Sequence, residues 1–288
     1  MILLSFDTEE YDVPREHGVE YDTLTDGMVV SKYGTSRILD VLKENNVRAT
    51  FFCTANFAEH APEVMKRILD EGHEVAAHGC DHWQPKADDV IQSKRRLEAL
   101  IHSLGFENYV VNGYRQPRMF PVSDVMIENE GYLYNSSLNP AFIPGRYMHL
   151  TAPRTPFWRK TGDGKQNNGK GVLEIPASVT PWFRFPLFWL AMHNLPMWLY
   201  KSWCRWAWKH DGQFVTYFHP WEFYQLDEHP ELKMPFIIRN HCGNRLAGRL
   251  GELIRMFKTE NATFGTYTEF TASFASADHD LQQVSCTS

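Results

Sequence analysis

The sequence has few cysteines, no excess of basic residues and no uninterrupted apolar run of membrane-spanning length. Its five cysteines are scattered and form no Cys-x-x-Cys pair. An odd, dispersed set of this kind indicates free thiols in a reducing compartment. The net charge of −6 and the pI near 6.1 argue against a nucleic-acid-binding protein, whose domain is normally basic.

The chain also begins without the pattern of a secretory leader. The apolar run at residues 1–6 is too short for a signal peptide and has no basic lead-in, so we expect a cytoplasmic protein. The nearest approach to a membrane span is 182–208, which is dense in Trp, Phe, Leu and Met. Charged residues and prolines interrupt it, whereas a span needs about 20 predominantly apolar residues.

Short β-rich runs alternate with helical patterns along the first half of the 288 residues. We expect strands at 2–6, 49–53, 74–77, 109–112 and 132–135, and helices at 36–45, 62–71, 88–104 and 121–129. Gly72, Gly105 and Gly131 follow three of these helices, where glycine typically ends a helix. The alternation predicts an α/β fold with a mostly parallel sheet or barrel.

The second half is less regular. We expect a hairpin tip at 160–171, strands at 172–176 and 213–219, and a helix at 246–259. These elements predict a single catalytic domain over 1–270, with an insertion at about 155–210. Residues 271–288 are polar and are expected to be a disordered tail.

Two carboxylates follow the first expected strand, and functional residues of barrels sit at the C-terminal ends of strands. Asp7 and Glu9 are two residues apart, which places both side chains on one face of an extended chain and turns Glu10 away. Such a pair can divide its labour, one carboxylate binding a metal and the other acting as base. A solvated acidic turn is an equally common explanation.

His78 and His82 lie directly after the third expected strand. Histidines four residues apart can face the same way and bind one ion. The chain has 13 histidines, so such a pair also arises by chance, and its position after a strand is the stronger signal.

Arg115 and His219 follow two further strands. Arg115 could orient a carboxylate through a bidentate pair, or it could be a surface residue before a turn. His219 ends a very apolar strand and could act as a general acid near neutral pH, or it could be a buried structural histidine.

The motifs FDTE, HGCDH, RQPR, YNSS and YFHP occur in this order. Their order and spacing over about residues 1–270 resemble the polysaccharide deacetylase (NodB-homology) family, carbohydrate esterase family four. The resemblance implies a distorted (β/α)7-type barrel, here with an aromatic-rich helical insertion and a hairpin. It also implies one divalent metal ion bound by Glu9, His78 and His82. Zn²⁺ suits such a ligand set, and Mn²⁺, Co²⁺ or Ni²⁺ would also be accepted.

The resemblance further assigns catalytic roles. Asp7 would be the general base, Arg115 would pair with it, and His219 would protonate the leaving amine. In the RQPR motif, which contains Pro117, the backbone N–H of Arg118 would help to form the oxyanion hole.

The sequence departs from the family pattern in two places, and one aromatic residue is a further candidate. Thr8 separates Asp7 from Glu9, so these two carboxylates could exchange roles. Asn135 stands where many members have an aspartate that supports the catalytic histidine. Trp221 could offer a sugar-stacking surface, although tryptophan is as often a packing residue.

These observations predict a metal-dependent hydrolase that removes an N-acetyl group from a sugar. A cytoplasmic enzyme needs an intracellular substrate, so we expect a lipid-linked precursor of a surface polysaccharide. Residues 182–208 would then contact the lipid headgroup region, unless they form a pair of core helices. The alternatives are a deformylase of a lipid-linked formamido sugar, and a non-catalytic carbohydrate-binding protein on the same barrel.

Overall fold

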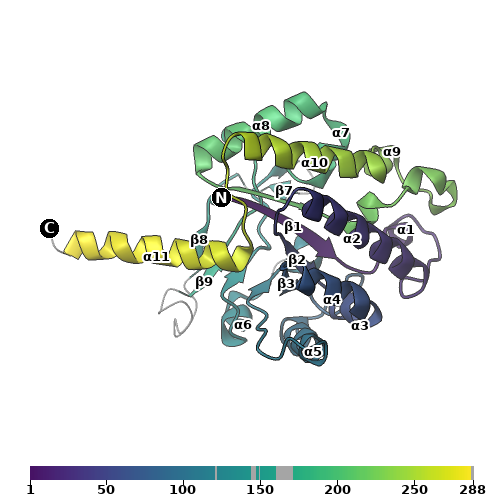
Figure 1. The fold of residues 1–288 in the computed structure, drawn as a ribbon, viewed down its shortest axis with the longest axis horizontal. Helices are drawn as coiled ribbons and strands as arrows, with labels where there is room; N and C mark the ends of the chain where they lie inside the picture. Colours follow the sequence, from purple (N-terminus) through teal and green to yellow (C-terminus); the bar gives the residue numbers. More distant parts are fainter. Residues whose placement is uncertain (121, 144–146, 149, 160–170, 287–288) are drawn as a thin grey trace.

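The computed structural model describes residues 1–120, 122–143, 147–148, 150–159 and 171–286. Its centre is a curled eight-stranded sheet surrounded by helices, with strand order β10-β1-β2-β3-β4-β5-β9-β8 (Figure 1). The strands are β1 (Ile2–Thr8), β2 (Thr50–Cys53), β3 (Glu74–Ala77), β4 (Gly113–Tyr114), β5 (Tyr134–Asn135), β8 (Phe157–Arg159), β9 (Val172–Glu174) and β10 (Phe214–Phe218). A separate antiparallel pair is formed by β6 (Phe142–Ile143) and β7 (Tyr147–Met148).

Neighbouring strands of the large sheet run parallel, except that β8 runs antiparallel to β9. Ser178, which follows β9, exchanges hydrogen bonds with Val215 of β10, so the two sides of the curled sheet approach each other. This architecture confirms the predicted α/β fold of the distorted-barrel type. The parallel arrangement also brings the carboxyl ends of β1, β3, β4 and β10 to one edge, where the site lies.

The helices lie around the sheet. They are α1 (Val13–Glu16), α2 (Asp26–Glu44), α3 (Ala55–His60), α4 (Pro62–Asp70), α5 (Asp89–Ser103), α6 (Asp124–Asn129), α7 (Trp189–Asn194), α8 (Met197–Asp211), α9 (Phe236–Arg239), α10 (Asn244–Thr259) and α11 (Tyr267–Cys286). Short 3₁₀ helices are η1 (Pro117–Met119), η3 (Pro220–Phe223), η4 (Leu226–Glu228) and η5 (Pro230–Leu232). The expected helices of the first half are found within a few residues of these bounds, except that α2 begins ten residues before 36.

Two apolar clusters stabilise the fold. The larger one fills the space between the sheet and the helices and includes Phe6, Phe51 and Leu250. The smaller one lies inside the barrel, where Leu3, Phe52 and Tyr134 meet Tyr267 and Phe270 from the start of α11. The first turns of α11 therefore close the barrel at the end opposite to the carboxyl ends of the strands.

Two expectations for the second half of the chain differ from the structure. The insertion expected at about 155–210 begins too early, because β8 and β9 belong to the central sheet. Their antiparallel pairing agrees with the predicted hairpin, whose tip at 160–170 lies outside the described residues. In the tail expected to be disordered, residues 271–286 are helical instead, as part of α11. The cause is visible at its start, where Phe270 and Phe274 pack on the barrel.

The strands expected at 109–112 and 132–135 are also shorter and displaced. In this part of the sheet the paired residues are those of β4, which directly follows the first range, and those of β5, the last two residues of the second range. The Tyr109 hydroxyl instead accepts a hydrogen bond from the Val75 N–H and donates one to the Val75 carbonyl. These bonds place residues before β4 alongside β3 without strand pairing.

The aromatic-rich stretch forms α7 and α8, with one face buried and the other exposed. Met192, Tyr200 and Cys204 are fully buried, whereas Trp198 is 69% exposed. The prediction of core helices is therefore correct for one face. Within the part of the chain that the structure describes, none of the helices has the length and apolar character needed to cross a membrane.

Candidate active site

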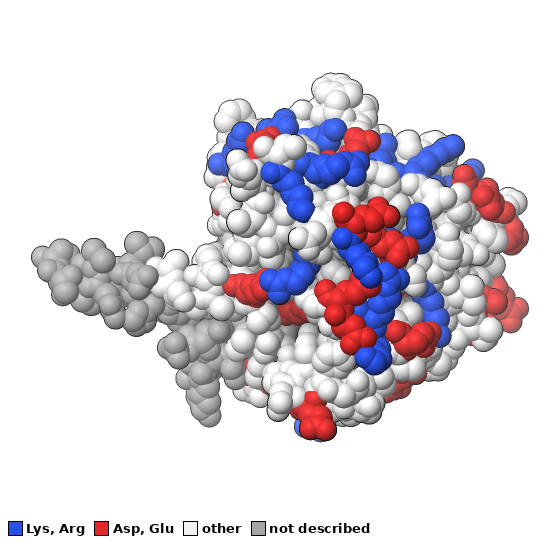
Figure 2. All heavy atoms as spheres, in the orientation of Figure 1, with Lys and Arg blue, Asp and Glu red and all other residues white. Residues whose placement is uncertain are grey.

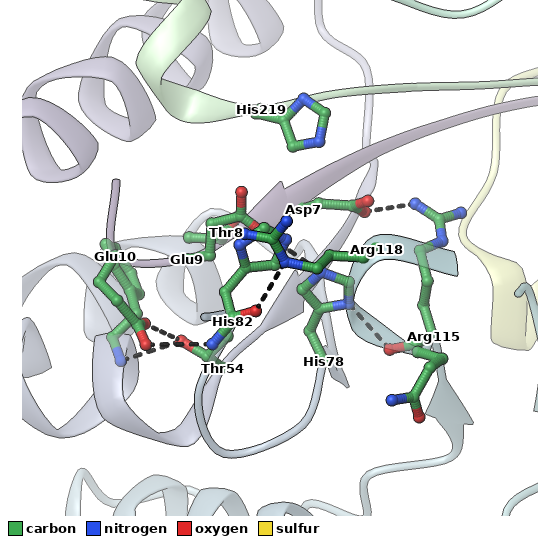
Figure 3. A network of polar contacts seen from close by, with 12 residues as sticks. Asp7, Thr8, Glu9, Glu10, Thr54, His78, His82, Arg115, Arg118 and His219 are labelled. Carbon is green, nitrogen blue, oxygen red and sulfur yellow. Dashed lines mark hydrogen bonds and ion pairs between the residues drawn. The ribbon is translucent and has the colours of Figure 1, made fainter. Parts of the chain in front are cut away.

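Asp7 and Glu9 lie at the carboxyl end of β1, and both side chains line the same cavity (Figure 3). Glu10 points away, as its spacing predicts, and its carboxylate accepts hydrogen bonds from Thr54 Oγ1 (2.6 Å) and the His82 backbone N–H (3.3 Å). All three carboxylates are nearly inaccessible to solvent. Since burying a charge is costly unless it is paired, each of them must have a compensating partner.

His78 and His82 belong to the loop after β3. Gly79 lies between them with a φ of +73°, a backbone conformation that glycine adopts without strain. A Cβ at this position would also come within 2.9 Å of Pro117 Cγ. The loop can therefore turn tightly against η1, and this turn brings both imidazoles to the end of β1. Pro117 is thus a packing residue of this loop.

Three ligand atoms converge at the cavity. Glu9 Oε2 lies 3.3 Å from His78 Nε2 and 3.2 Å from His82 Nε2, and one ligand atom from each residue falls within 4.8 Å of the others. Glu9 Oε2 is buried, and none of the residues that the structure describes hydrogen-bonds to it, although both nitrogens are close. Short separations without hydrogen-bond geometry are what a shared central ion would require of its ligands. One carboxylate and two imidazoles with open positions fit a catalytic divalent metal.

The outer nitrogen of each imidazole is held by another group. His78 Nδ1 lies 2.8 Å from the Arg115 carbonyl oxygen, and His82 Nδ1 lies 2.8 Å from Asp12 Oδ2. Contacts of this kind fix the tautomer that presents Nε2 to a metal. Asp12 was not identified from the sequence, although it follows the same acidic motif.

The side chain of Arg118 supports this arrangement from outside. Its guanidinium contacts Asp12 (3.2 Å) and Glu16 (2.5 Å), and its Nε donates to the His82 carbonyl. Arg118 has a φ of +57°, and it also lines the cavity. The oxyanion role of its backbone N–H stays a prediction.

Asp7 has a fully buried cation as its partner. Arg115 Nη1 donates to Asp7 Oδ1 at 2.5 Å, and the same guanidinium donates to Ser5, Ser136 and Tyr267. Burial alone would raise the pKa of Asp7. The Arg115 charge, with smaller contributions from His78 and His219, holds that pKa below its ordinary value. The pairing of Arg115 with Asp7 that the family resemblance implied is confirmed.

His219 faces this group from the end of β10, on the opposite side from His78 and His82 (Figure 3). Its Nδ1 lies 2.7 Å from Glu222 Oε1, and its ring stacks on Trp221 at 5.4 Å between centroids. Burial alone would lower the pKa of His219. The hydrogen bond to Glu222, with the charges of Glu9, Glu222 and Asp7, raises it above its ordinary value.

The structure does not place Asn135 beside His219. Its amide donates to Glu174 Oε2 (2.8 Å) and its carbonyl accepts from Ser137, so its side chain is directed to the neighbouring strand β9. The carboxylate that supports His219 comes from Glu222. The available signal was the spacing His-Pro-Trp-Glu, because a proline-started turn brings its third residue back to the turn's first backbone N–H. The 2.7 Å hydrogen bond from the His219 N–H to Glu222 shows this geometry.

These groups share a cavity of about 530 Å³. Its polar wall contains Asp7, Glu9, Glu16, His78, His82, Arg118 and His219, and its apolar wall contains Val13, Met119, Phe120, Trp189, Tyr217, Trp221 and Ile238. The sequence-predicted residues therefore meet at one place, with the exceptions of Asn135, Pro117 and Arg115, which do not line it.

Comparison with known proteins confirms the resemblance indicated by the motifs. Residues 13–102 match the family model described as Polysaccharide deacetylase. The chain is 28% identical to the peptidoglycan deacetylase of Helicobacter pylori over 49% of its own length and 46% of the relative. It is 33% identical to the peptidoglycan-N-acetylmuramic acid deacetylase PdaA of Bacillus subtilis, over 27% of this chain and 28% of the relative. The matched regions thus span less than half of each relative.

Solved structures of similar fold cover nearly the whole chain. A polysaccharide deacetylase described as putative from Mycobacterium smegmatis superposes with a TM-score of 0.64 at 18% identity, covering 96% of this chain and 90% of that one. Puue allantoinase superposes with a TM-score of 0.60 at 15% identity, covering 94% and 88%. At such low identity these likenesses establish the fold alone.

Proposed function

We propose that the protein is a metal-dependent amide hydrolase that removes an N-acetyl group from a sugar. The observation that carries the proposal is the convergence of Glu9, His78 and His82 on one side of a cavity that Asp7 and His219 also line. The deacetylase relatives agree with it. The matched family region contains His78 and His82 but begins after Asp7 and Glu9, so the carboxylate roles rest on the geometry.

The metal would be held by Glu9, His78 and His82, and a divalent ion bound there acts as a Lewis acid toward a carbonyl and acidifies water. Asp7 is assigned as the base because it stands apart from the three converging atoms and its lowered pKa keeps it ionised. It would accept the proton of the attacking water. This division favours Glu9 over Asp7 as the ligand.

His219 is assigned as the acid. Its raised pKa favours the imidazolium near neutral pH, and its position across the cavity from the base suits delivery of a proton to the departing amine. An amide nitrogen cannot leave as an anion, so this proton must arrive before or during cleavage. The backbone N–H of Arg118 is our candidate for the oxyanion donor.

The apolar wall suits a sugar. Trp189 and Trp221 present aromatic surface next to His219, and aromatic rings pack against the apolar faces of sugar rings. Arg118, a cation at the cavity, is engaged by Asp12 and Glu16 rather than available to a phosphate. We therefore expect the sugar, and not a charged linker, to occupy the space beside His219.

The test is to measure acetate and formate release from N-acetylated and N-formylated amino-sugar substrates, both polymeric and lipid-linked, with the Zn²⁺-loaded protein. Acetate release supports the proposal, and formate release alone would identify a deformylase instead. Binding of sugar without release of either acid would indicate the non-catalytic alternative.

A finer proposal concerns contact with a lipid surface through α8 and the turn before α7. Trp182, Phe183 and Trp198 are exposed by 81%, 50% and 69%, and Trp182 packs edge-on against Trp206. Figure 2 shows lysine and arginine side chains gathered over α8 and α10, with acidic groups among them. Lys201 pairs with Glu252, and Arg205 and Lys209 pair with Glu260. The aromatic side chains would therefore contribute more than the charges do.

We expect co-sedimentation with vesicles of phosphatidylglycerol and phosphatidylcholine, and at least about a tenfold weaker partition for the Trp182→Ser/Trp198→Ser variant, since burial of each ring contributes more than 1 kcal/mol. Tyr109→Phe, at the β3 side of the fold, is the matched aromatic control. Equal partition of the double variant and the wild type would contradict the proposal. The cytoplasmic location stays a prediction.

A further inference from the structure

A chain of buried side chains leads from His219 into α7. His219 Nδ1 contacts Glu222 Oε1 at 2.7 Å, and Glu222 Oε2 contacts His193 Nε2 at 2.9 Å. The side chains of Glu222 and His193 have no exposed surface. Of the three residues only His219 lines the cavity. The hydrogen-bonded route from the other two to the cavity therefore passes through His219.

Glu222 is a buried carboxylate held mainly by imidazoles. Among the described residues, its ion pairs are with His193 and His219, and neither lysine nor arginine pairs with it. The third donor is the backbone N–H of His219, at 2.7 Å. A buried carboxylate is costly unless its oxygens accept hydrogen bonds, so its orientation depends on these donors.

This network determines which ring nitrogens carry protons. An ionised carboxylate only accepts hydrogen bonds, so His219 must donate from Nδ1 and His193 from Nε2. The other nitrogen of His219, Nε2, is then left for the cavity. The other nitrogen of His193, Nδ1, lies 4.0 Å from Cys242 Sγ.

We propose that Glu222 and His193 are positioning residues, which hold the acid His219 in the tautomer and orientation that present its Nε2 to the substrate. This inference rests on the proposed hydrolase function. Glu222 takes the place of the aspartate that the sequence lacks at Asn135. His193 acts one step further away, by fixing the carboxylate of Glu222.

The aromatic-rich segment thus contributes buried side chains that pack against the site. Trp189, one turn before His193 on α7, packs edge-on against His219 at 5.6 Å and against His193 at 5.7 Å between centroids. The charged groups that face His219 are Glu222 from η3, and Asp7 and Glu9 from the end of β1. Of these three, Glu222 makes the direct contact with Nδ1.

The first test is Glu222→Gln in the full-length, Zn²⁺-loaded protein. The amide keeps the shape but removes the charge, so the protonated form of His219 is less stabilised. We expect kcat to fall about 10- to 100-fold with little change in KM. We also expect the alkaline limb of the kcat–pH profile to move to lower pH, because a lower pKa for His219 means that its proton is lost earlier as pH rises. An unchanged profile would overturn the role of Glu222.

The second test separates positioning from packing. His193→Phe keeps a ring but removes the donor, and we expect about a tenfold loss of kcat. His193→Gln, whose amide can still donate, should recover part of it. In the Glu222→Gln background His193→Phe should add little, because its effect passes through Glu222. Independent, multiplying losses would overturn the role of His193.

The matched control is Tyr200→Phe. It removes a buried hydrogen bond on α8, to the Leu187 carbonyl, without touching the chain from His219 to His193. We expect it to retain wild-type kcat and pH profile. If His193→Phe lost no more activity than this control, its role would be packing only.

A spectroscopic measurement tests the positioning role of Glu222 and His193 separately from the proposed hydrolase function. The imidazole ¹⁵N resonances of His219, assigned by comparison with His219→Gln, report its tautomer and pKa whether or not turnover is detected. Nδ1–H in the neutral form, and a pKa lowered by Glu222→Gln but not by Tyr200→Phe, support the positioning role. The opposite tautomer would overturn it. A wild-type protein that shows this spectrum but releases no acyl group would contradict the proposed function alone.

Discussion

Replacing His78 by alanine is expected to remove metal binding and turnover together. The imidazole supplies one of three converging ligand atoms, and alanine has no atom that could bind a metal in its place. Losing the metal's stabilisation of transition-state charge costs several kcal/mol, and about 1.4 kcal/mol is tenfold in rate. We therefore expect kcat/KM to fall by about 10³-fold or more, with metal content measured by elemental analysis.

The control is His60→Ala, at an exposed position on α3 where Nδ1 contacts the Asn56 carbonyl. This variant should keep one metal ion per chain and full turnover. Full activity in His78→Ala, with metal removed by chelation, would refute the metal-hydrolase proposal.

The second large effect is expected from Asp7→Asn. The amide can still accept a hydrogen bond from Arg115, but it cannot take a proton from water. We expect kcat to fall about 10²- to 10⁴-fold, as for loss of a general base, while Glu9, His78 and His82 still bind the metal. The variant also leaves the Arg115 charge buried without its partner, so the protein should be less stable, by as much as about 3–5 kcal/mol.

Glu74→Gln is the matched carboxylate-to-amide control. Glu74 lies inside the barrel away from the cavity, where it accepts hydrogen bonds from Thr50, Tyr134 and Thr268. Glu74 does not line the cavity, so its exchange for glutamine leaves the groups that line the cavity in place. It should keep its metal and its turnover. Loss of metal in Asp7→Asn, with Glu74→Gln unaffected, would mean that Asp7 is a ligand and that its role and that of Glu9 are exchanged.

The strand-end residues could be predicted from the sequence because local patterns determine them. The apolar runs of β1 and β3 end where Asp7 and His78 begin, and parallel strands must bring their carboxyl ends to one edge. The glycines that follow the helices mark where each helix ends, so the alternation of strands and helices can be recognised in the sequence. The lengths of β4 and β5 could not be predicted, because their pairing depends on neighbours distant in sequence.

The carboxylate next to His219 could not be found from the motif order, for a physical reason. Asn135 occupies the right place in the motif order, but its side chain is satisfied by Glu174 on the adjacent strand. Glu222 is only three residues from His219, and a 3₁₀ turn folds it back. His193 could not be predicted, because it lies 26 positions before His219 and only tertiary packing brings them together.

The prediction of a disordered tail used its polar composition and overlooked the helical spacing of its apolar residues. Tyr267, Phe270 and Phe274 recur at spacings of three and four, typical of one face of a helix. These apolar residues pack into or against the barrel, whereas Ser273 and Ser276 of α11 are exposed to solvent.

The closure of the barrel by α11 has a consequence for synthesis of the chain. Tyr267 OH donates to or accepts from Ser5 and accepts from Arg115, the partner of Asp7, while β1 pairs with β10. A nascent chain on the ribosome therefore exposes the base and its arginine long before the residues that enclose them have been translated. Folding of the first strands during synthesis therefore cannot enclose Asp7 and Arg115 as the structure shows before α11 has been translated.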